Sequence, residues 1–194
     1  MTTPYYRYGV ILADPPWKSQ VGGGRIKRGA DRHYPLMSTK ELCAMAHDIP
    51  SANDSVLFMW STWNDIPEAL KVIQAWGFTY VSGLPWVKLT SNGVVAIGLG
   101  QYLRGCSEPL LFATRGHVQR LQGASPLALL MEEGTPLVTP RMEHSRKPTT
   151  AYEFAECFPG PYLEVFARSR REGWDAFGNE VDKYAAQPAL SLGL

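Results

Sequence analysis

Four residues whose side chains and backbone could do chemistry stand together near the start of the chain: Asp14, Pro15, Pro16 and Trp17. Two successive prolines fix φ twice and remove two N–H donors, and each pushes the residue before it into an extended conformation. Asp14 and the rigid Pro15 carbonyl can therefore accept the two N–H bonds of an exocyclic amine, while Trp17 stacks on the ring that carries it. The alternative is a turn in which Asp14 only caps a helix.

A basic, glycine-rich segment follows this tetrapeptide directly. Residues 18–32 contain five basic side chains against one acidic, a net charge of +4, together with four glycines. This composition predicts a mobile loop that contacts phosphates, although a solvated loop without a partner is the alternative. The candidate nucleic-acid contacts are Lys18, Arg25, Lys27, Arg28, Arg32 and the neighbouring aromatic Tyr34.

Several classes of protein are poorly supported by the sequence. It has no GxxxxGK[ST] phosphate loop, no GxGxxG fingerprint, no HExxH and no GxSxG. The three cysteines lie far apart and the four histidines show no metal-ligand spacing, so no metal is expected. A net charge of +1 argues against a globally basic nucleic-acid binder. No apolar run is long enough to cross a bilayer and no secretory signal opens the chain, so we expect a cytoplasmic protein.

The remaining pattern predicts the elements that must position these residues. Short apolar runs alternate with helix-forming segments, which is typical of one α/β domain over residues 1–194 with a mostly parallel sheet. The predicted strands cover residues 9–13, 55–60, 78–82, 85–88, 109–114, 162–167 and 174–177. The predicted helices cover residues 38–47, 65–76 and 148–157, and residues 89–105 and 115–140 are expected to be irregular. The first helix begins with a capping box, Ser38 and Glu41, and Gly77 ends the second.

Nine segments in order resemble one family over nearly the whole chain. They are VILADPPW (10–17), HYPLMS (33–38), LFMWST (57–62), WGF (76–78), PWVK (85–88), GLGQYLRGCSEPLLFATRG (98–116), RMEHSRKP (141–148), PGPYLEVFAR (159–168) and GWDAFGNE (173–180). The sequence resembles the DPPW-type N6-adenine methyltransferases, the family of the catalytic subunit of the eukaryotic mRNA adenosine methyltransferase, and most of all its compact bacterial and phage members.

The resemblance implies a Rossmann-like methyltransferase fold in permuted order, with the catalytic tetrapeptide first and the strand that binds S-adenosylmethionine (SAM) last. SAM is the implied cofactor and nucleic acid the implied partner, with DNA favoured over RNA, no membrane, and a homodimer allowed. The catalytic residues implied are Asp14, Pro15, Pro16 and Trp17. The cofactor-binding residues implied are Asp14, Ser145, Lys147, Pro148, Glu164, Phe166, Arg168, Asn179 and Glu180.

The chain departs from the family pattern at Ser107, where the eukaryotic enzymes place a lysine before the glutamate equivalent to Glu108. Lys147 or Arg168 is then expected to face the SAM carboxylate. Three other classes are alternatives to an active enzyme: a catalytically inactive methyltransferase-like platform, a protein-amide methyltransferase and a plain nucleic-acid-binding domain. The presence of Asp14 disfavours the inactive platform. The sequence DPPW, in place of NPPY, disfavours the protein-amide methyltransferase. A plain nucleic-acid-binding domain would not explain the segments 141–148 and 173–180.

Overall fold

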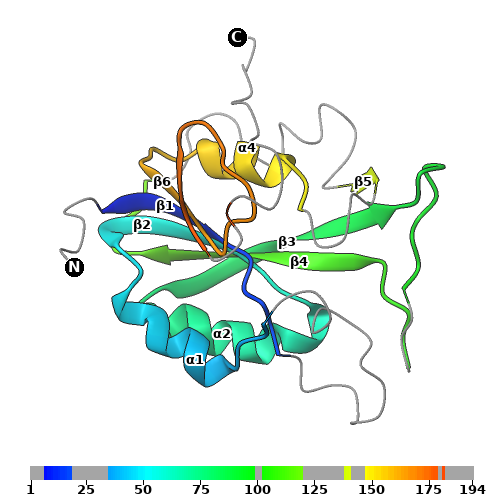
Figure 1. The fold of residues 1–194 in the computed structure, drawn as a ribbon, viewed down its shortest axis with the longest axis horizontal. Helices are drawn as coiled ribbons and strands as arrows, with labels where there is room; N and C mark the ends of the chain where they lie inside the picture. The colour runs from blue at the N-terminus through cyan, green and yellow to red at the C-terminus, as the bar shows by residue number, and fades with distance from the viewer. Residues whose placement is uncertain are drawn as a thin grey trace.

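The computed structural model describes residues 7–18, 35–98, 102–119, 138–140, 147–178 and 181, with the backbone alone at 138–140. The described residues contain a seven-stranded sheet of order β5-β3-β4-β2-β1-β6-β7 (Figure 1). Its strands are β1 (Tyr8–Ala13), β2 (Ser51–Trp60), β3 (Thr79–Leu89), β4 (Ser107–Arg115), β5 (Val138–Pro140), β6 (Tyr162–Val165) and β7 (Trp174–Phe177). The helices are α1 (Thr39–Ala44), α2 (Ile66–Ala75) and α4 (Thr150–Glu156), with 3-10 turns η2 (Met45–His47) and η3 (Trp63–Asp65).

The strand pairings confirm a mostly parallel sheet. Strand β1 runs parallel to β2 and β6, β6 parallel to β7, and β3 parallel to β5. Only β4 is antiparallel to its neighbours, β2 and β3. The carboxyl ends of β1, β2, β3, β6 and β7 therefore meet the amino end of β4 at a single edge of the sheet, and we call this edge the carboxyl edge.

Helices cover both faces of the sheet, with α1 and α2 on one side and α4 on the other (Figure 1). Strand β1 is buried between the two layers, because Ile11 and Ala13 pack into the cluster under α1 and α2 while Val10 and Leu12 pack toward α4. A strand with both faces buried reads as a continuous apolar run, which is the pattern the sequence has at residues 9–13.

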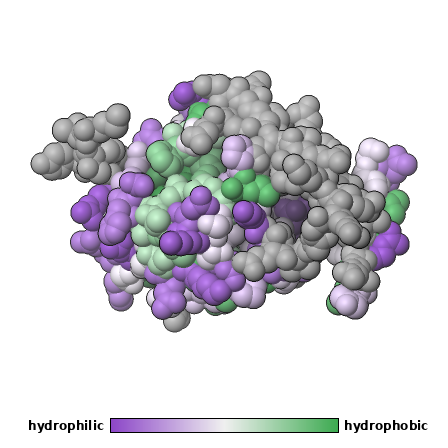
Figure 2. Space-filling view, turned by 60° about the horizontal axis from the view of Figure 1, so that its bottom comes forward, coloured by the Kyte–Doolittle hydropathy of each residue, from purple (hydrophilic) through white to green (hydrophobic). Residues whose placement is uncertain are grey.

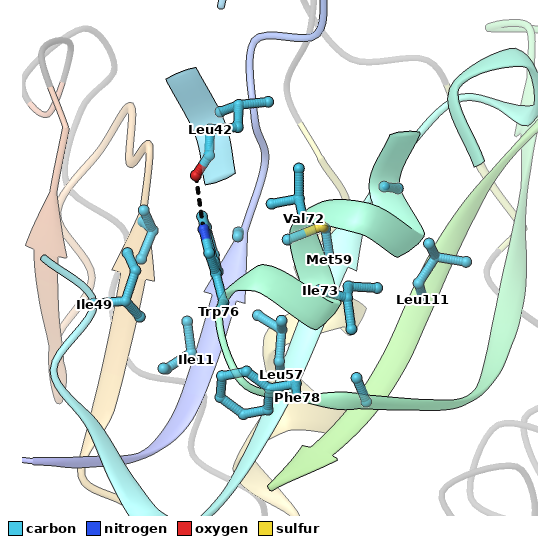
Figure 3. Packing of buried hydrophobic residues seen from close by; sticks show 14 of the residues in the cluster. Ile11, Leu42, Ile49, Leu57, Met59, Val72, Ile73, Trp76, Phe78 and Leu111 are labelled. Atoms are coloured by element: carbon cyan, nitrogen blue, oxygen red, sulfur yellow. Dashed lines mark hydrogen bonds between the residues drawn. The ribbon is translucent and has the colours of Figure 1, made fainter. Parts of the chain in front are cut away.

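The cluster under α1 and α2 is tied together by one buried polar contact. The indole N–H of Trp76 donates to the Leu42 carbonyl at 2.8 Å, which joins the end of α2 to α1 (Figure 3). Around it lie Leu57, Ile73 and Phe78, all less than 5% exposed. Partly buried side chains of η2, Met45 and Ala46, pack against this cluster. The face of the molecule turned forward in Figure 2 shows pale green apolar surface among purple hydrophilic residues.

The helix ends follow the predicted signals. Ser38 Oγ accepts from the Glu41 backbone N–H, and the Ser38 N–H donates to Glu41 Oε2 at 2.7 Å, so the capping box is confirmed. Helix α2 stops before Gly77, whose φ of +82° is the left-handed conformation that glycine adopts without steric cost. No helix within the described ranges is long and apolar enough to cross a membrane.

Several predicted boundaries were wrong, including the start of β2, which begins at Ser51 rather than at residue 55. The strands predicted at 78–82 and 85–88 form the single strand β3 from Thr79 to Leu89, because pairing with β4 continues across Gly83 and Pro85. Strand β5 lies in the stretch predicted to be irregular, and it pairs with residues 87–89 of β3. Strand β6 ends at Val165 rather than at residue 167, because Phe166 adopts a φ of +65° and leaves the extended conformation.

Candidate active site

The carboxyl edge brings together side chains from segments that are far apart in the sequence. Asp14 follows β1 directly, Lys88 lies near the end of β3, and Glu108 lies near the start of β4. Lys147 lies just before α4, and Arg168 follows the end of β6. We call these five residues the edge charge cluster.

Ion pairs connect the five side chains into a chain of alternating charge. Lys147 Nζ lies 2.9 Å from Asp14 Oδ1 and 3.0 Å from Oδ2, so it bridges both carboxylate oxygens. The same ammonium lies 3.6 Å from Glu108 Oε2, and Lys88 pairs with Glu108 on the other side. Arg168 approaches Asp14 Oδ2 at 3.5 Å. All five side chains are less than a quarter exposed, so these pairs are screened less than surface ion pairs.

The cluster holds its central members in their charged forms. Burial opposes the charge of Lys147, but Asp14 and Glu108 outweigh it and raise the pKa of this lysine above its ordinary value. Burial also opposes the charge of Glu108, but Lys147 and Lys88 hold the pKa of Glu108 below its ordinary value. Lys147 is therefore an ammonium and Glu108 a carboxylate at neutral pH, and each depends on the other.

The tetrapeptide after β1 is held by backbone hydrogen bonds. The Asp14 N–H donates to the Val165 carbonyl at 3.3 Å, and the Pro16 carbonyl accepts from Met37 N–H at 2.8 Å. The Trp17 indole N–H donates to the Trp60 carbonyl at 3.0 Å. The tetrapeptide is thus anchored to β6, to the start of the α1 region and to the end of β2.

The Pro15 carbonyl is less free than the sequence suggested. Its oxygen accepts from the backbone N–H of Trp17 at 2.9 Å. A carbonyl oxygen has two lone pairs, so one acceptor position remains beside Asp14. Asp14 likewise keeps acceptor capacity, because a carboxylate offers about four lone-pair positions and Lys147 and Arg168 occupy part of them.

A second buried network lies on the α4 face of β6. Burial raises the pKa of Glu164 to about 7, Asp14 adds to this rise, and Tyr152, Arg168 and Arg171 oppose it. Arg171 is only 4% exposed, stacks on the Tyr152 ring at 4.7 Å, and donates to Glu156 at 3.0 Å. Glu164 therefore titrates near neutral pH beside the edge charge cluster.

The ends of β6 and β7 approach each other closely at the carboxyl edge. Phe166 N–H donates to the Phe177 carbonyl at 2.6 Å. A Cβ on Gly178 would lie 2.8 Å from the Ala167 backbone nitrogen and 2.9 Å from its carbonyl oxygen. Only glycine fits there, and a non-glycine residue held at positive φ, as Phe166 is, recurs at ligand-binding sites.

The predicted site residues that lie within the described ranges gather at one edge of the sheet. Asp14, Pro15, Pro16, Trp17, Lys147, Pro148, Glu164, Phe166 and Arg168 all lie at or beside the carboxyl edge, and Lys18 is exposed next to them. The other predicted site residues lie outside the described ranges: Ser145, Asn179, Glu180, Arg25, Lys27, Arg28, Arg32 and Tyr34.

Sequence reasoning missed several residues of the site. Lys88 and Glu108 stood in quoted segments without an assigned role, and Tyr152 and Arg171 were not singled out. A charged residue at the end of an apolar strand could have pointed to them, as Lys88 does in PWVK and Glu108 in SEPLLF. Trp60, at the end of β2, is 1% exposed and packs edge-on against Trp86.

Comparisons with known proteins agree with this architecture. The MT-A70 family model matches residues 8–180. Over 92% of its length the chain is 30% identical to "Type II methyltransferase M.MunI" of Mycoplasma sp, and it covers 79% of that protein. Over 91% of its length it is 28% identical to "N6-methyladenosine RNA methyltransferase MTA1" of Cryphonectria parasitica and to the human "N(6)-adenine-specific methyltransferase METTL4". It covers 52% and 38% of those two proteins.

The chain belongs to the MT-A70 family, and its sheet, with Asp14 at the end of the first strand, is the Rossmann-like fold of a SAM-dependent methyltransferase.

Proposed function

We propose that this protein transfers a methyl group from SAM to the N6 amine of adenine in nucleic acid, with DNA as its substrate. The observation that carries the proposal is the position of Asp14 at the carboxyl end of β1. Its carboxylate is fixed by Lys147 at 2.9 Å and Arg168 at 3.5 Å, beside a Pro15 carbonyl with one lone pair left.

The residues at the carboxyl edge suit SAM as a ligand. SAM carries a carboxylate, an ammonium and a sulfonium, and the edge charge cluster offers both signs of charge at short range. The close approach of Gly178 to Ala167 leaves backbone without a side chain at the end of β7. Lys147, Pro148, Glu164, Phe166 and Arg168 would hold SAM, with Ser145, Asn179 and Glu180 as further predicted contacts. When bound, SAM supplies a methyl group activated by its sulfonium.

Asp14 and Pro15 supply the protein's part of the chemistry. The lone pair of the adenine N6 is delocalised into the ring, which makes it a poor nucleophile. Two acceptors that receive hydrogen bonds from its N–H groups favour a pyramidal nitrogen and stabilise the positive charge that develops there. Lys147 and Arg168 keep the carboxylate in place, so it does not have to reorganise during the reaction.

The target base must reach Asp14 from outside a duplex. A base within the stack is inaccessible to a pocket of this kind, so it is flipped out or arrives in a single strand. Trp17, whose indole N–H is bonded to the Trp60 carbonyl, is the proposed contact to the adenine ring. Lys18 begins the basic segment expected to contact phosphates. DNA is proposed because the chain covers 79% of the relative named as a type II methyltransferase, against 52% of the RNA methyltransferase.

Nucleoside mass spectrometry after incubation with SAM tests the proposal. Unmodified single-stranded DNA, duplex DNA and RNA are supplied in separate reactions, with Asp14→Ala as the negative control. We expect N6-methyldeoxyadenosine from DNA. Methyladenosine from RNA alone would overturn the choice of DNA, and SAM binding without transfer to any substrate would indicate the inactive platform instead. The homodimer stays a prediction, which sedimentation of the same preparation tests.

A further inference from the structure

Trp63 is a large aromatic side chain that the fold leaves half exposed beside the site. Its exposed fraction is 52%, whereas Trp60, Trp76 and Trp86 are each below 5%. It lies in η3, three residues after the end of β2. At this edge of the sheet the exposed part of the indole is accessible to a ligand.

The indole is held in position by the protein. Its N–H donates to Ser107 Oγ at 3.0 Å. The turn that carries it is fixed as well, since Thr62 Oγ1 donates to Asp65 Oδ2 at 2.6 Å and Asp65 is only 4% exposed. A ring whose single polar atom is already bonded offers its face for stacking at little further cost in conformational entropy.

The anchor of Trp63 places it to one side of Asp14. Ser107 precedes Glu108 of the edge charge cluster, at the start of β4. In the sheet, β4 is separated from β1 by β2. Two strand spacings put β4 and β1 about 10 Å apart across the sheet. A nucleic-acid strand with its target base at Asp14 therefore has its neighbouring nucleotides within reach of the Trp63 ring.

We propose that Trp63 stacks on a base that neighbours the target adenine and thereby holds the strand at the site. The proposal rests on the proposed function, because it takes Asp14 as the position of the target base. Stacking is sequence-tolerant, since every base has a π-face. Trp63 thus adds affinity for an unpaired strand and fixes the position of the flanking nucleotide relative to the target adenine.

Binding of a short adenine-containing single-stranded DNA, followed by fluorescence anisotropy, tests the proposal. Trp63→Ala is expected to weaken binding by about 5- to 150-fold, the range for loss of one base–aromatic stack. Trp63→Phe keeps a ring and should retain most of the affinity. Tyr80→Ala is the matched control, because Tyr80 is 46% exposed near the start of β3, at the opposite edge of the sheet.

Coupling to an abasic site identifies the partner of Trp63. Removing the base at one of the two positions that flank the adenine should weaken binding by the wild type as much as Trp63→Ala does. The same removal should not further weaken binding by the Trp63→Ala variant. Unchanged binding by Trp63→Ala, coupling to the target position alone, or coupling at neither flank would overturn the proposal. Methyl transfer to the same strand is measured in parallel by nucleoside mass spectrometry. A wild type that binds the strand with this coupling but transfers no methyl group contradicts the proposed function and not the role of Trp63.

Discussion

Asp14 carries one negative charge and lies against two cations, Lys147 and Arg168. This surplus of positive charge fixes the carboxylate but does not consume all its acceptor positions. The residue is therefore built to stay in one orientation while a third donor, the target amine, approaches. A residue that capped a helix would need only one such contact.

Asp14→Asn tests this interpretation with little change of shape. The amide keeps one acceptor oxygen but loses the negative charge that faces the developing ammonium, so turnover should fall by about 100- to 1,000-fold. SAM affinity should stay within a few-fold, as measured by calorimetry. Near-normal turnover in the folded variant would mean that Asp14 has no catalytic role, because Asn and Asp cap helices about equally well.

Glu164 should make the stability of the protein depend on pH. Its pKa is raised from 4.5 to about 7 in the folded protein, so between these values the folded state holds a proton that the unfolded chain has released. The free energy of unfolding therefore falls as pH rises through this window, by about 3 kcal/mol for this group. Glu164→Gln removes that contribution.

Urea unfolding of wild type and Glu164→Gln at pH 5 and pH 8 measures the effect. The wild type should lose stability relative to the variant between the two values. Glu172→Gln, at an exposed position in the turn before β7, controls for the loss of one negative charge. Parallel pH profiles for the wild type and Glu164→Gln would contradict the raised pKa.

At the scale of elements, the ends of β6 and β7 are the least tolerant part of the edge. Gly178→Ala would put a Cβ against the Ala167 backbone, which cannot rotate away as a side chain can. We expect a loss of about 1–3 kcal/mol in the free energy of unfolding together with weaker SAM binding. Gly105→Ala is the control, because a Cβ there meets nothing within 4 Å. Equal thermal stability of the two variants would refute the tight approach.

Much of the architecture could be predicted because local signals and tertiary packing agree. The buried run before Asp14, the Ser38 capping box and Gly77 each have a physical meaning that does not depend on distant residues. Strand β3 could not be predicted as one element, since Gly83 and Pro85 interrupt the local pattern and pairing with β4 decides the outcome.

The site was predictable only where a motif lies within one segment. Asp14 and Pro15 stand in a tetrapeptide whose chemistry is readable from its neighbours. The pair of Lys88 and Glu108 is created by antiparallel pairing across 20 positions, and Arg171 on Tyr152 by packing of α4 on the sheet. Contacts of this kind appear only after the topology is known.

At the scale of the whole molecule, a side-chain hydrogen bond joins the first of the described strands, β1, to the last of them, β7. The Tyr8 hydroxyl donates to Asp175 Oδ2 at 2.6 Å, across 167 positions of sequence. Tyr8→Phe should lower the free energy of unfolding by about 2 kcal/mol, the value for a hydrogen bond to a charged group. Tyr102→Phe, at a position 91% exposed, should change nothing. Equal denaturation midpoints for the two variants would show that the bond does not stabilise the fold.

The central place of β1 has a consequence for gene expression. This strand is translated well before β6, one of its two neighbours in the sheet. Until then, Asp14 lacks both Lys147 and Arg168. A copy of the gene interrupted by a premature stop codon before codon 147 would still encode the DPPW tetrapeptide, but its product would have neither counter-ion. In a genome, the tetrapeptide alone would therefore not distinguish an intact gene of this kind from its decayed remnant.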